Sequence, residues 1–405
     1  MNTAKRWLLP DGVEDILPDE AHKLESLRRR ILDLYASWGY QLIITPLVEY
    51  LDSLLVGTSH DLDLHTFKIT DQLSGRMLGV RADITPQAAR IDAHGLNYQG
   101  PARLCYADSV LHTRPGGLLT SRIPIRAGAE LFGHDSVACD IELICLMHAT
   151  MEEAAVEDVT MVLGHVGLFR TLLAAAQLPA EVEAELFEAV QRKAFDDIDG
   201  IVHKSVSNKK LAGVLGQLVR LSGGEEVLET AGNLFAAAPK EAKQELAELT
   251  AIVAGVKQRL PDIRLGFDLC ELRGYQYHTG IVFAAYTPAY GRALAQGGRY
   301  DHIGQVFGRA RPASGFDSDL KVLNKLSASG ADSNPDREAS RPCAILAPDN
   351  ADPALMKLIA KLRAAGEVVI TDLGNETVTA GQFTQELNCD RQITMQDGNW
   401  VVVSP

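Results

Sequence analysis

A block rich in alanine, leucine and glutamate, at about residues 180–260, most constrains the fold because short β-like segments lie on both sides of it. Runs such as HTFKITD, MLGVRAD, ARLCYADSVL and GAELFGH come before it, and IRLGFDLCE, GIVFAAY and CAILAPD come after it. Helices do not alternate regularly with these strands, as they would in a chain of βαβ units. The pattern therefore predicts an α+β protein with an antiparallel sheet core, surrounding helices and a mostly helical insertion.

The chain also contains a plausible domain boundary near its C-terminal end. Its 405 residues exceed what one hydrophobic core usually supports. The small, polar stretch SASGADSNPDREASRP is typical of a linker. After it, CAILAP, the helical pattern DPALMKLIAKLRAAG and further β-like runs indicate a small α/β domain. We expect a core over residues 1–325, a linker over 326–340 and a C-terminal domain over 341–405.

Composition limits the classes of function. The net charge of −14, from 39 basic and 53 acidic residues, argues against an extended nucleic-acid-binding surface. No apolar run is long enough for a membrane helix, and the N-terminal apolar triplet is followed at once by Pro10, unlike a signal peptide. The six cysteines are dispersed, and CxxC, HExxH and GxSxG motifs are absent from the sequence. We expect a cytoplasmic protein with no cofactor, no metal site and no membrane partner.

Two short stretches contain polar groups that can bind an amino acid. RADIT, at residues 81–85, offers Asp83 for an ammonium group and Thr85 for a polar edge. The competing interpretation is an Asp-containing turn capped by Thr85. In GAELFG, strand alternation places Glu130 on the face opposite its apolar neighbours. An inward-facing Glu130 needs partners, and the alternative is a glutamate facing solvent on a half-buried strand.

A third stretch, LRGYQYHTG at residues 272–280, combines Arg273, Tyr277 and His278. A guanidinium can bind a carboxylate and aromatic rings can enclose a flat ring, although a surface hairpin with stacked aromatics fits the same pattern. Farther on, Gly297 and Gly298 lack the spacing of a phosphate-binding loop. They indicate a strand or bulge in which another backbone approaches closely.

Taken in order, these stretches resemble histidyl-tRNA synthetases, a family of class II aminoacyl-tRNA synthetases. The resemblance covers roughly residues 5–325 and includes LPDGVEDILPDEA, GYQLIITPLVEY, GVRADITPQAAR, HTRPGG followed by RAGAELFG, LRGYQYHTGIVF and GGRYDHIGQVFGRARPASGFDSDLKVL. It implies a class II synthetase-like core in which GYQLIITPLVEY belongs to a dimerisation element. From its residue pattern alone, the same segment predicts a buried strand with Pro46 at a kink or an edge.

The departures from this family fall on residues that hold ATP. In the family, an arginine of the second motif binds the α-phosphate, and an arginine of the third motif binds the γ-phosphate. Alignment on the HTRP run places Leu111 at the first arginine and Thr113 at a nearby glutamate, and GFDSDLKVL places Val322 at the second arginine. The neighbouring Lys321 offers a point charge and not a planar fork. Because such arginines contribute orders of magnitude in rate, the resemblance implies that adenylate formation is lost.

The family's histidine pocket is partly kept. The resemblance implies a histidine-binding site made of Asp83, Thr85, Arg126, Glu130, Arg273, Tyr277 and His278. Two of these residues differ from the family, because Arg126 stands where the family has glutamine and His278 where it has a second tyrosine. These two differences leave the identity and the affinity of the ligand open.

This combination, together with a C-terminal segment that is shorter than an anticodon-binding domain, resembles the regulatory subunits of ATP phosphoribosyltransferase. Those proteins are paralogues of histidyl-tRNA synthetase. The resemblance implies a non-catalytic homodimer without tRNA binding, which joins a short catalytic subunit in a hetero-octamer. It also implies a part in the first step of histidine biosynthesis and in feedback inhibition by histidine. The alternatives are an active histidyl-tRNA synthetase or an amino-acid ligase derived from one, and both would have to tolerate Leu111 and Val322.

Overall fold

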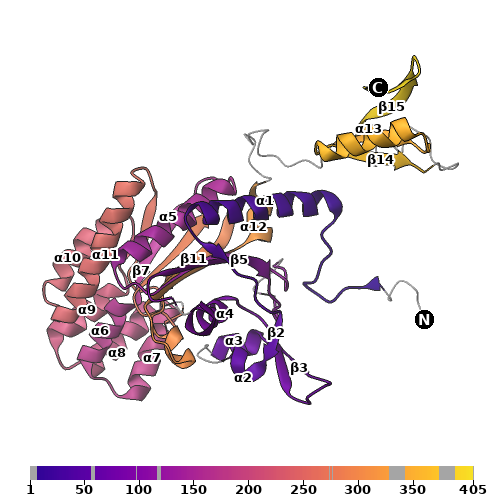
Figure 1. Cartoon of the computed structure of the whole chain (residues 1–405). Helices are drawn as coiled ribbons and strands as arrows, with labels where there is room; N and C mark the ends of the chain where they lie inside the picture. The colour runs from indigo at the N-terminus through magenta and orange to yellow at the C-terminus, as the bar shows by residue number, and fades with distance from the viewer. Residues whose placement is uncertain are drawn as a thin grey trace. The chain divides into compact units, whose positions relative to one another are not determined.

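The computed structural model describes residues 7–55, 60–96, 98–115, 120–272, 274–275, 277–327, 343–373 and 388–404. Contacts within the chain define two units (Figure 1). The large unit contains Met1–Asp15 and Leu27–Ser333, and the small unit contains Ile16–Ser26 and Asn334–Pro405. Most of the expected linker over 326–340 lies outside the described residues.

A nine-stranded sheet forms the centre of the large unit, in the order β1-β5-β6-β12-β11-β10-β7-β9-β8. Neighbouring strands from β5 to β7 in this order are antiparallel, whereas the pairs β1–β5 and β7–β9 are parallel. The predicted α+β class with an antiparallel core is therefore confirmed. The strands of this sheet are β1 (Gln41–Leu42), β5 (Ala102–Ser109), β6 (Ile125–Phe132), β7 (Thr160–His165), β8 (Ser222–Gly223), β9 (Leu265–Asp268), β10 (Ile281–Thr287), β11 (Tyr290–Arg299) and β12 (Ala313–Asp319).

Glycines allow the central strands to approach one another and their side chains. A Cβ atom on Gly297 of β11 would lie 2.3 Å from the carbonyl oxygen of Gly315 on β12. Any larger residue at position 297 would therefore force these strands apart. This close approach is what the paired glycines predicted, and Gly298 on the same strand leaves room for the ring of His278.

Helices surround the sheet, and a group of them forms the predicted insertion. The insertion consists of α7 (Ala180–Gln191), α8 (Phe195–Ser205), α9 (Lys209–Leu218), α10 (Glu226–Phe235) and α11 (Lys240–Arg259), gathered on the side of β7 (Figure 1). The other helical elements are α1 (Pro18–Ser37), α2 (Leu51–Leu54), α3 (His60–His65), α4 (Thr85–Arg90), the π-helical turn Ile91–Leu96, α5 (Val137–Glu153), α6 (Val166–Ala176), the 3-10 turn Ile303–Phe307 and α12 (Leu320–Ser327). Apolar residues at helical spacing, such as Leu249, Ile252 and Val256, form the buried face of α11.

The segment from Tyr40 to Tyr50 differs from its expected form. It makes only the short strand β1 and, after a break, β2 (Val48–Tyr50), which joins β3 (Phe67–Thr70) and β4 (Met77–Val80) in a second, three-stranded sheet. Leu42, Ile44 and Leu47 are 51, 83 and 50% exposed. The predicted buried strand was therefore wrong for a single chain, because β1 is the outermost strand of its sheet and its apolar side chains lack cover there.

The described residues of the C-terminal segment of the small unit form a four-stranded sheet in the order β14-β13-β15-β16 and the helix α13. Its elements are β13 (Ala344–Pro348), α13 (Pro353–Ala364), β14 (Val368–Asp372), β15 (Cys389–Gln396) and β16 (Asn399–Val403). The carboxylate of Asp352 accepts a hydrogen bond from the backbone amide of Ala354 at 2.8 Å and caps α13. Ile345, Ile359 and Ile393 are buried between the helix and the sheet. The predicted small α/β domain is confirmed.

Candidate functional site

A cavity of about 320 Å³ opens against the central strands β6, β12, β11, β10 and β7 of the large unit. This volume is at the lower end of the range for small-molecule sites, roughly 300–1,000 Å³. Several side chains predicted from sequence to form an amino-acid pocket come together in its lining: Asp83, Thr85, Glu130, Tyr277 and His278. Segments that are far apart in the sequence thus place these groups in one site.

Glu130 lies in the floor of the cavity and is 1% exposed. Its Oε1 atom accepts hydrogen bonds from the Thr85 hydroxyl at 2.8 Å and the Tyr106 hydroxyl at 3.0 Å, and the Tyr300 hydroxyl donates to Oε2. Gly315 is directly opposite on β12, where a Cβ atom would collide with the carboxylate. The inward-facing interpretation of Glu130 is therefore the one the structure shows, and the solvent-facing alternative was wrong.

Burial dominates the protonation of Glu130 and raises its pKa to about 8, although the three hydroxyl groups oppose this shift. The carboxyl group therefore holds a proton over much of the neutral range in this arrangement. A cation placed beside it would favour the ionised form and lower its pKa. A cationic ligand at this position would therefore displace the proton.

Asp83 forms the turn that was one of the two interpretations left open by the sequence, and its side chain also reaches the cavity. Its Oδ1 atom accepts hydrogen bonds from the backbone amides of Ile84 at 2.6 Å and Thr85 at 3.1 Å, so it does form an Asp turn at the start of α4. The same side chain lines the cavity. By contrast, the buried guanidinium of Arg81 contacts Ser109, Thr45 and Asp108, so the cation of the RADIT stretch is used to hold the fold.

Arg126 lies next to the cavity but not in its lining. Its Nη1 atom is 3.5 Å from Oδ1 of Asp317, which does line the cavity. Burial raises the pKa of Asp317 to about 6, while Arg126 opposes the shift and Asp83 adds to it. Asp317 was missed at the level of sequence, although its alternation with Gly315 along β12 places both on the same face of the strand.

Aromatic residues form one wall of the cavity. The rings of Tyr277 and Tyr300 are stacked, with centroids 5.1 Å apart and planes inclined by 23°, and the ring of His278 is edge-on to Tyr277. The Tyr277 hydroxyl is buried and has no hydrogen-bond partner within the described residues. Arg170 supports this wall by donating to the carbonyl of His278 at 2.8 Å. The seventh predicted residue, Arg273, lies outside the described residues.

The positions aligned with ATP-binding residues are occupied by groups engaged in the fold. The backbone amide of Leu111 donates to the backbone carbonyl of Arg81, and the Thr113 hydroxyl donates to the carbonyl of Leu64 at 2.7 Å. Val322 lies in the first turn of α12. The ammonium group of Lys321 beside it lies 3.4 Å from the Glu14 carboxylate. Neither aligned position carries a guanidinium group, because one residue is leucine and the other is valine.

Comparisons with known proteins identify the family. A family model described as histidyl-tRNA synthetase matches residues 12–323, and one described as the ATP phosphoribosyltransferase subunit HisZ C-terminal domain matches residues 341–403. Proteins named ATP phosphoribosyltransferase regulatory subunit, from Ectopseudomonas mendocina and Stutzerimonas stutzeri, are each 51% identical over 402 residues, which is 99% of both chains in each pair. This chain belongs to the family of ATP phosphoribosyltransferase regulatory subunits.

Solved structures agree with this family. A crystal structure described as an ATP phosphoribosyltransferase regulatory subunit/histidyl-tRNA synthetase from Bacillus halodurans is 26% identical, with a TM-score of 0.81 over 96% of this chain and 98% of that one. Histidyl-tRNA synthetase from Nostoc sp. PCC 7120 is 19% identical, with a TM-score of 0.76 over 98% and 97% of the two chains, and it shows the shared fold. Within the described residues of this family member, no helix is both long and apolar enough to span a bilayer.

Proposed function

We propose that this family member acts with a short catalytic subunit of ATP phosphoribosyltransferase in the first step of histidine biosynthesis and makes that subunit responsive to histidine. The observation that carries the proposal is the contrast between two parts of one synthetase-like core. The cavity retains a buried Glu130 that contacts three hydroxyl groups, whereas Leu111 and Val322 stand at the positions of the phosphate-binding arginines. Such a core can bind an amino acid without activating it.

The cavity is the proposed histidine sensor. Asp83, Glu130 and Asp317 supply carboxyl groups for an ammonium group and for imidazole N–H groups. Arg126 is the cation beside them that suits a carboxylate, and we retain Arg273 as a second one. Thr85 adds a hydroxyl group to the site. The aromatic rings of Tyr277 and His278 complete it with a wall for a flat ligand ring.

We further propose that the chain has no aminoacylation activity of its own and binds no tRNA. An arginine on a transferring phosphoryl group contributes orders of magnitude in rate, and neither Leu111 nor Val322 can replace it. Lys321 does not compensate, because Glu14 neutralises its charge. The replaced arginines and the charge of −14 support this part of the proposal.

Assembly as a homodimer, and with the catalytic subunit as a hetero-octamer in the cytoplasm, completes the proposal. The exposed side chains of Leu42, Ile44 and Leu47 support the homodimer. They form an apolar edge beside the outermost strand β1, in the segment that resembles the synthetase dimerisation element. A second copy of the chain would cover this edge and remove its apolar area from water.

The test is reconstitution with a purified short catalytic subunit, with phosphoribosyl-ATP formation measured with and without histidine. We expect formation only when both chains are present, and inhibition as histidine is added. ATP–pyrophosphate exchange on this chain alone is the matched control, and we expect no histidine-dependent exchange. Robust exchange, or a catalytic subunit indifferent to this chain, would contradict the proposal.

A further inference from the structure

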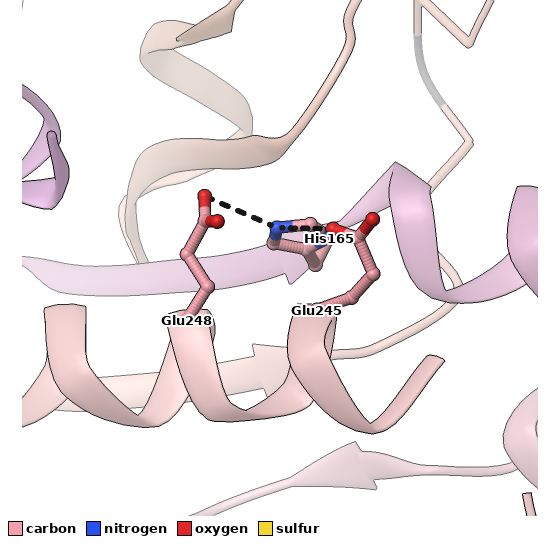
Figure 2. Close-up of side chains that lie close together, drawn as sticks. All are labelled: His165, Glu245 and Glu248. Carbon is pink, nitrogen blue, oxygen red and sulfur yellow. Dashed lines mark ion pairs between the residues drawn. The ribbon is translucent and has the colours of Figure 1, made fainter. Parts of the chain in front are cut away.

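A second cluster of ionisable groups lies at the end of β7, outside the amino-acid cavity. It consists of His165, the last residue of β7, with Glu245 and Glu248 on the facing side of α11 (Figure 2). Nε2 of His165 is 3.5 Å from Oε2 of Glu245 and 3.8 Å from Oε1 of Glu248. One ligand-type atom from each residue falls within 4.8 Å of the other two.

His165 has an unusual environment for a buried histidine. Its side chain is fully buried, and neither ring nitrogen makes a hydrogen bond within the described part of the chain. Buried polar atoms are normally hydrogen-bonded, because an unpartnered one loses its interaction with water and gains nothing in exchange. Nε2 points toward the two carboxylates, as Figure 2 shows, so an interaction at this position would satisfy it.

Two arginines in this region are engaged elsewhere. The Arg170 guanidinium donates its hydrogen bonds to the carbonyls of Tyr275 and His278. The Arg299 guanidinium is paired with the buried Asp140 at 2.6 Å. The two carboxylates therefore retain negative charge that these arginines do not take up by direct contact.

We propose that His165, Glu245 and Glu248 bind one divalent transition-metal ion of the zinc class. Imidazole nitrogen and carboxylate oxygen both suit zinc, at about 2.0–2.2 Å. Ligand atoms around such an ion are separated by roughly 3.0–3.5 Å, so the glutamates need to close by only a fraction of an ångström to about 1 Å. Their side chains are 31 and 36% exposed, which gives them freedom to move and leaves an entry path and an open position for water.

The surrounding residues fit such a site. Gly167, at the start of α6, leaves room for Glu245, because a Cβ atom there would lie 2.6 Å from Oε2. An ion held here would link α11, the last helix of the insertion, to the end of β7. The adjacent amide of Val166 donates to Gly280, which follows the aromatic wall of the cavity. Since Nδ1 of His165 lacks an orienting partner, we expect weaker binding than at a site that has one, by about 10–100-fold.

Zinc titration of the metal-free, full-length chain by calorimetry tests this inference. The exposed thiol of Cys343 is changed to serine in every sample so that it does not bind zinc. We expect one ion per chain, and a loss of affinity of at least about tenfold in Glu248→Gln and more in the Glu245→Gln/Glu248→Gln pair. Glu229→Gln, an exposed glutamate of α10 outside the cluster, is the control and should bind as the parent does.

A ligand-preserving substitution separates a metal site from a simple ion pair. Glu248→His replaces one zinc ligand with another, so zinc affinity should stay within about tenfold of the parent, while the ion pair of His165 with Glu248 is lost and only the one with Glu245 remains. Circular dichroism of each variant verifies the fold. No binding at one ion per chain, or unchanged binding in the Glu245→Gln/Glu248→Gln pair, would overturn the inference. Either result leaves the proposed regulatory function untouched, because that function is tested without zinc.

Discussion

The cavity and the positions aligned with the family's phosphate-binding arginines belong to the same core. The cavity contains the buried, ionisable side chain of Glu130, whereas the aligned positions hold apolar side chains. In the cavity, a carboxyl group that is costly to bury is retained and surrounded by three hydroxyl donors. At the phosphate positions, Leu111 and Val322 are apolar, and the neighbouring Lys321 faces Glu14. One region keeps the groups that we propose recognise a ligand, and the other lacks groups that would stabilise a phosphoryl transfer.

If the cavity binds an amino acid as we propose, binding and chemistry are separable in this fold. A buried Glu130 does not stabilise the core better than a well-packed apolar residue would, so we attribute its presence to the proposed ligand. Gly315 strengthens this argument, because the neighbouring strand leaves out a side chain where the carboxylate lies. The predictions below test this contrast.

The largest effect should appear in the pH dependence of stability. The ordinary pKa of Glu130 is 4.5 and burial raises it to about 8, so between these values the folded chain holds a proton that the unfolded chain has released. The stabilisation is complete below the unfolded pKa and is lost as pH rises through the folded one. The free energy of unfolding should fall by up to about 1.4 kcal/mol per pH unit over this range.

Denaturant unfolding between pH 6.5 and 8.5 measures this slope. These limits are chosen because Asp317, with a pKa of about 6, adds a fall of the same sign mainly below them. In Glu130→Gln the contribution of this residue should disappear, and Glu229→Gln should leave it intact. An equal slope in Glu130→Gln would show that the carboxyl group is already ionised in the folded chain.

A smaller loss of stability is expected when a methyl group fills the space that the Glu130 carboxyl group occupies. In Gly315→Ala the new methyl group overlaps Oε2 of Glu130 and must displace it from the Tyr300 hydroxyl. We expect the free energy of unfolding to drop by about 1–3 kcal/mol, the usual cost of overpacking. Gly291→Ala on β11, where the methyl group meets nothing within 4 Å, is the matched control for thermal unfolding. Equal stability of the two variants would mean that Glu130 moves without cost.

Much of the site was accessible from local sequence pattern. The RADIT turn and the strand that carries Glu130 are set by neighbouring residues, and the structure contains both the turn and the strand. The order of the family motifs then connected stretches that no local rule joins. The exposed segment around Ile44 was mispredicted for a definite reason, because its apolar residues indicate burial without indicating whether the same chain supplies the cover.

The other contacts of the two sites depend on the order of strands in the sheet, and the spacing of residues along the sequence could not predict them. Asp317 reaches Arg126 only because β12 pairs with β6 across almost two hundred residues of sequence. His165 and Glu245 are likewise brought together by the packing of α11 near β7, and no motif links a lone histidine to two glutamates so far along the chain. Groups of this kind become visible only when the topology is known.

On the ligand side of the comparison, Tyr277→Ala should weaken inhibition by histidine in the reconstituted complex by about tenfold, since it removes a ring that forms the cavity wall. Tyr98→Ala, an exposed tyrosine away from the cavity lining, is the control. The histidine concentration for half-maximal inhibition is the measurement. If it is unchanged in Tyr277→Ala, the sensor lies at a subunit interface or on the catalytic partner.

The smallest effect is expected from restoring charge to the other region. In the Leu111→Arg/Val322→Arg pair both missing guanidinium groups return, but Thr113 still occupies the position of the family's glutamate. The new arginine at position 322 would also be close in sequence to Asp319, whose carboxylate accepts a hydrogen bond from the Lys321 amide. This carboxylate would compete with a phosphate group for the new guanidinium. We expect ATP–pyrophosphate exchange to stay undetectable. Activation of the catalytic subunit should change by no more than about twofold, as for other substitutions away from a functional site. Measurable exchange would mean that the two arginines were all that this core lacked, and that the cavity and its surroundings still form a complete site for activating an amino acid.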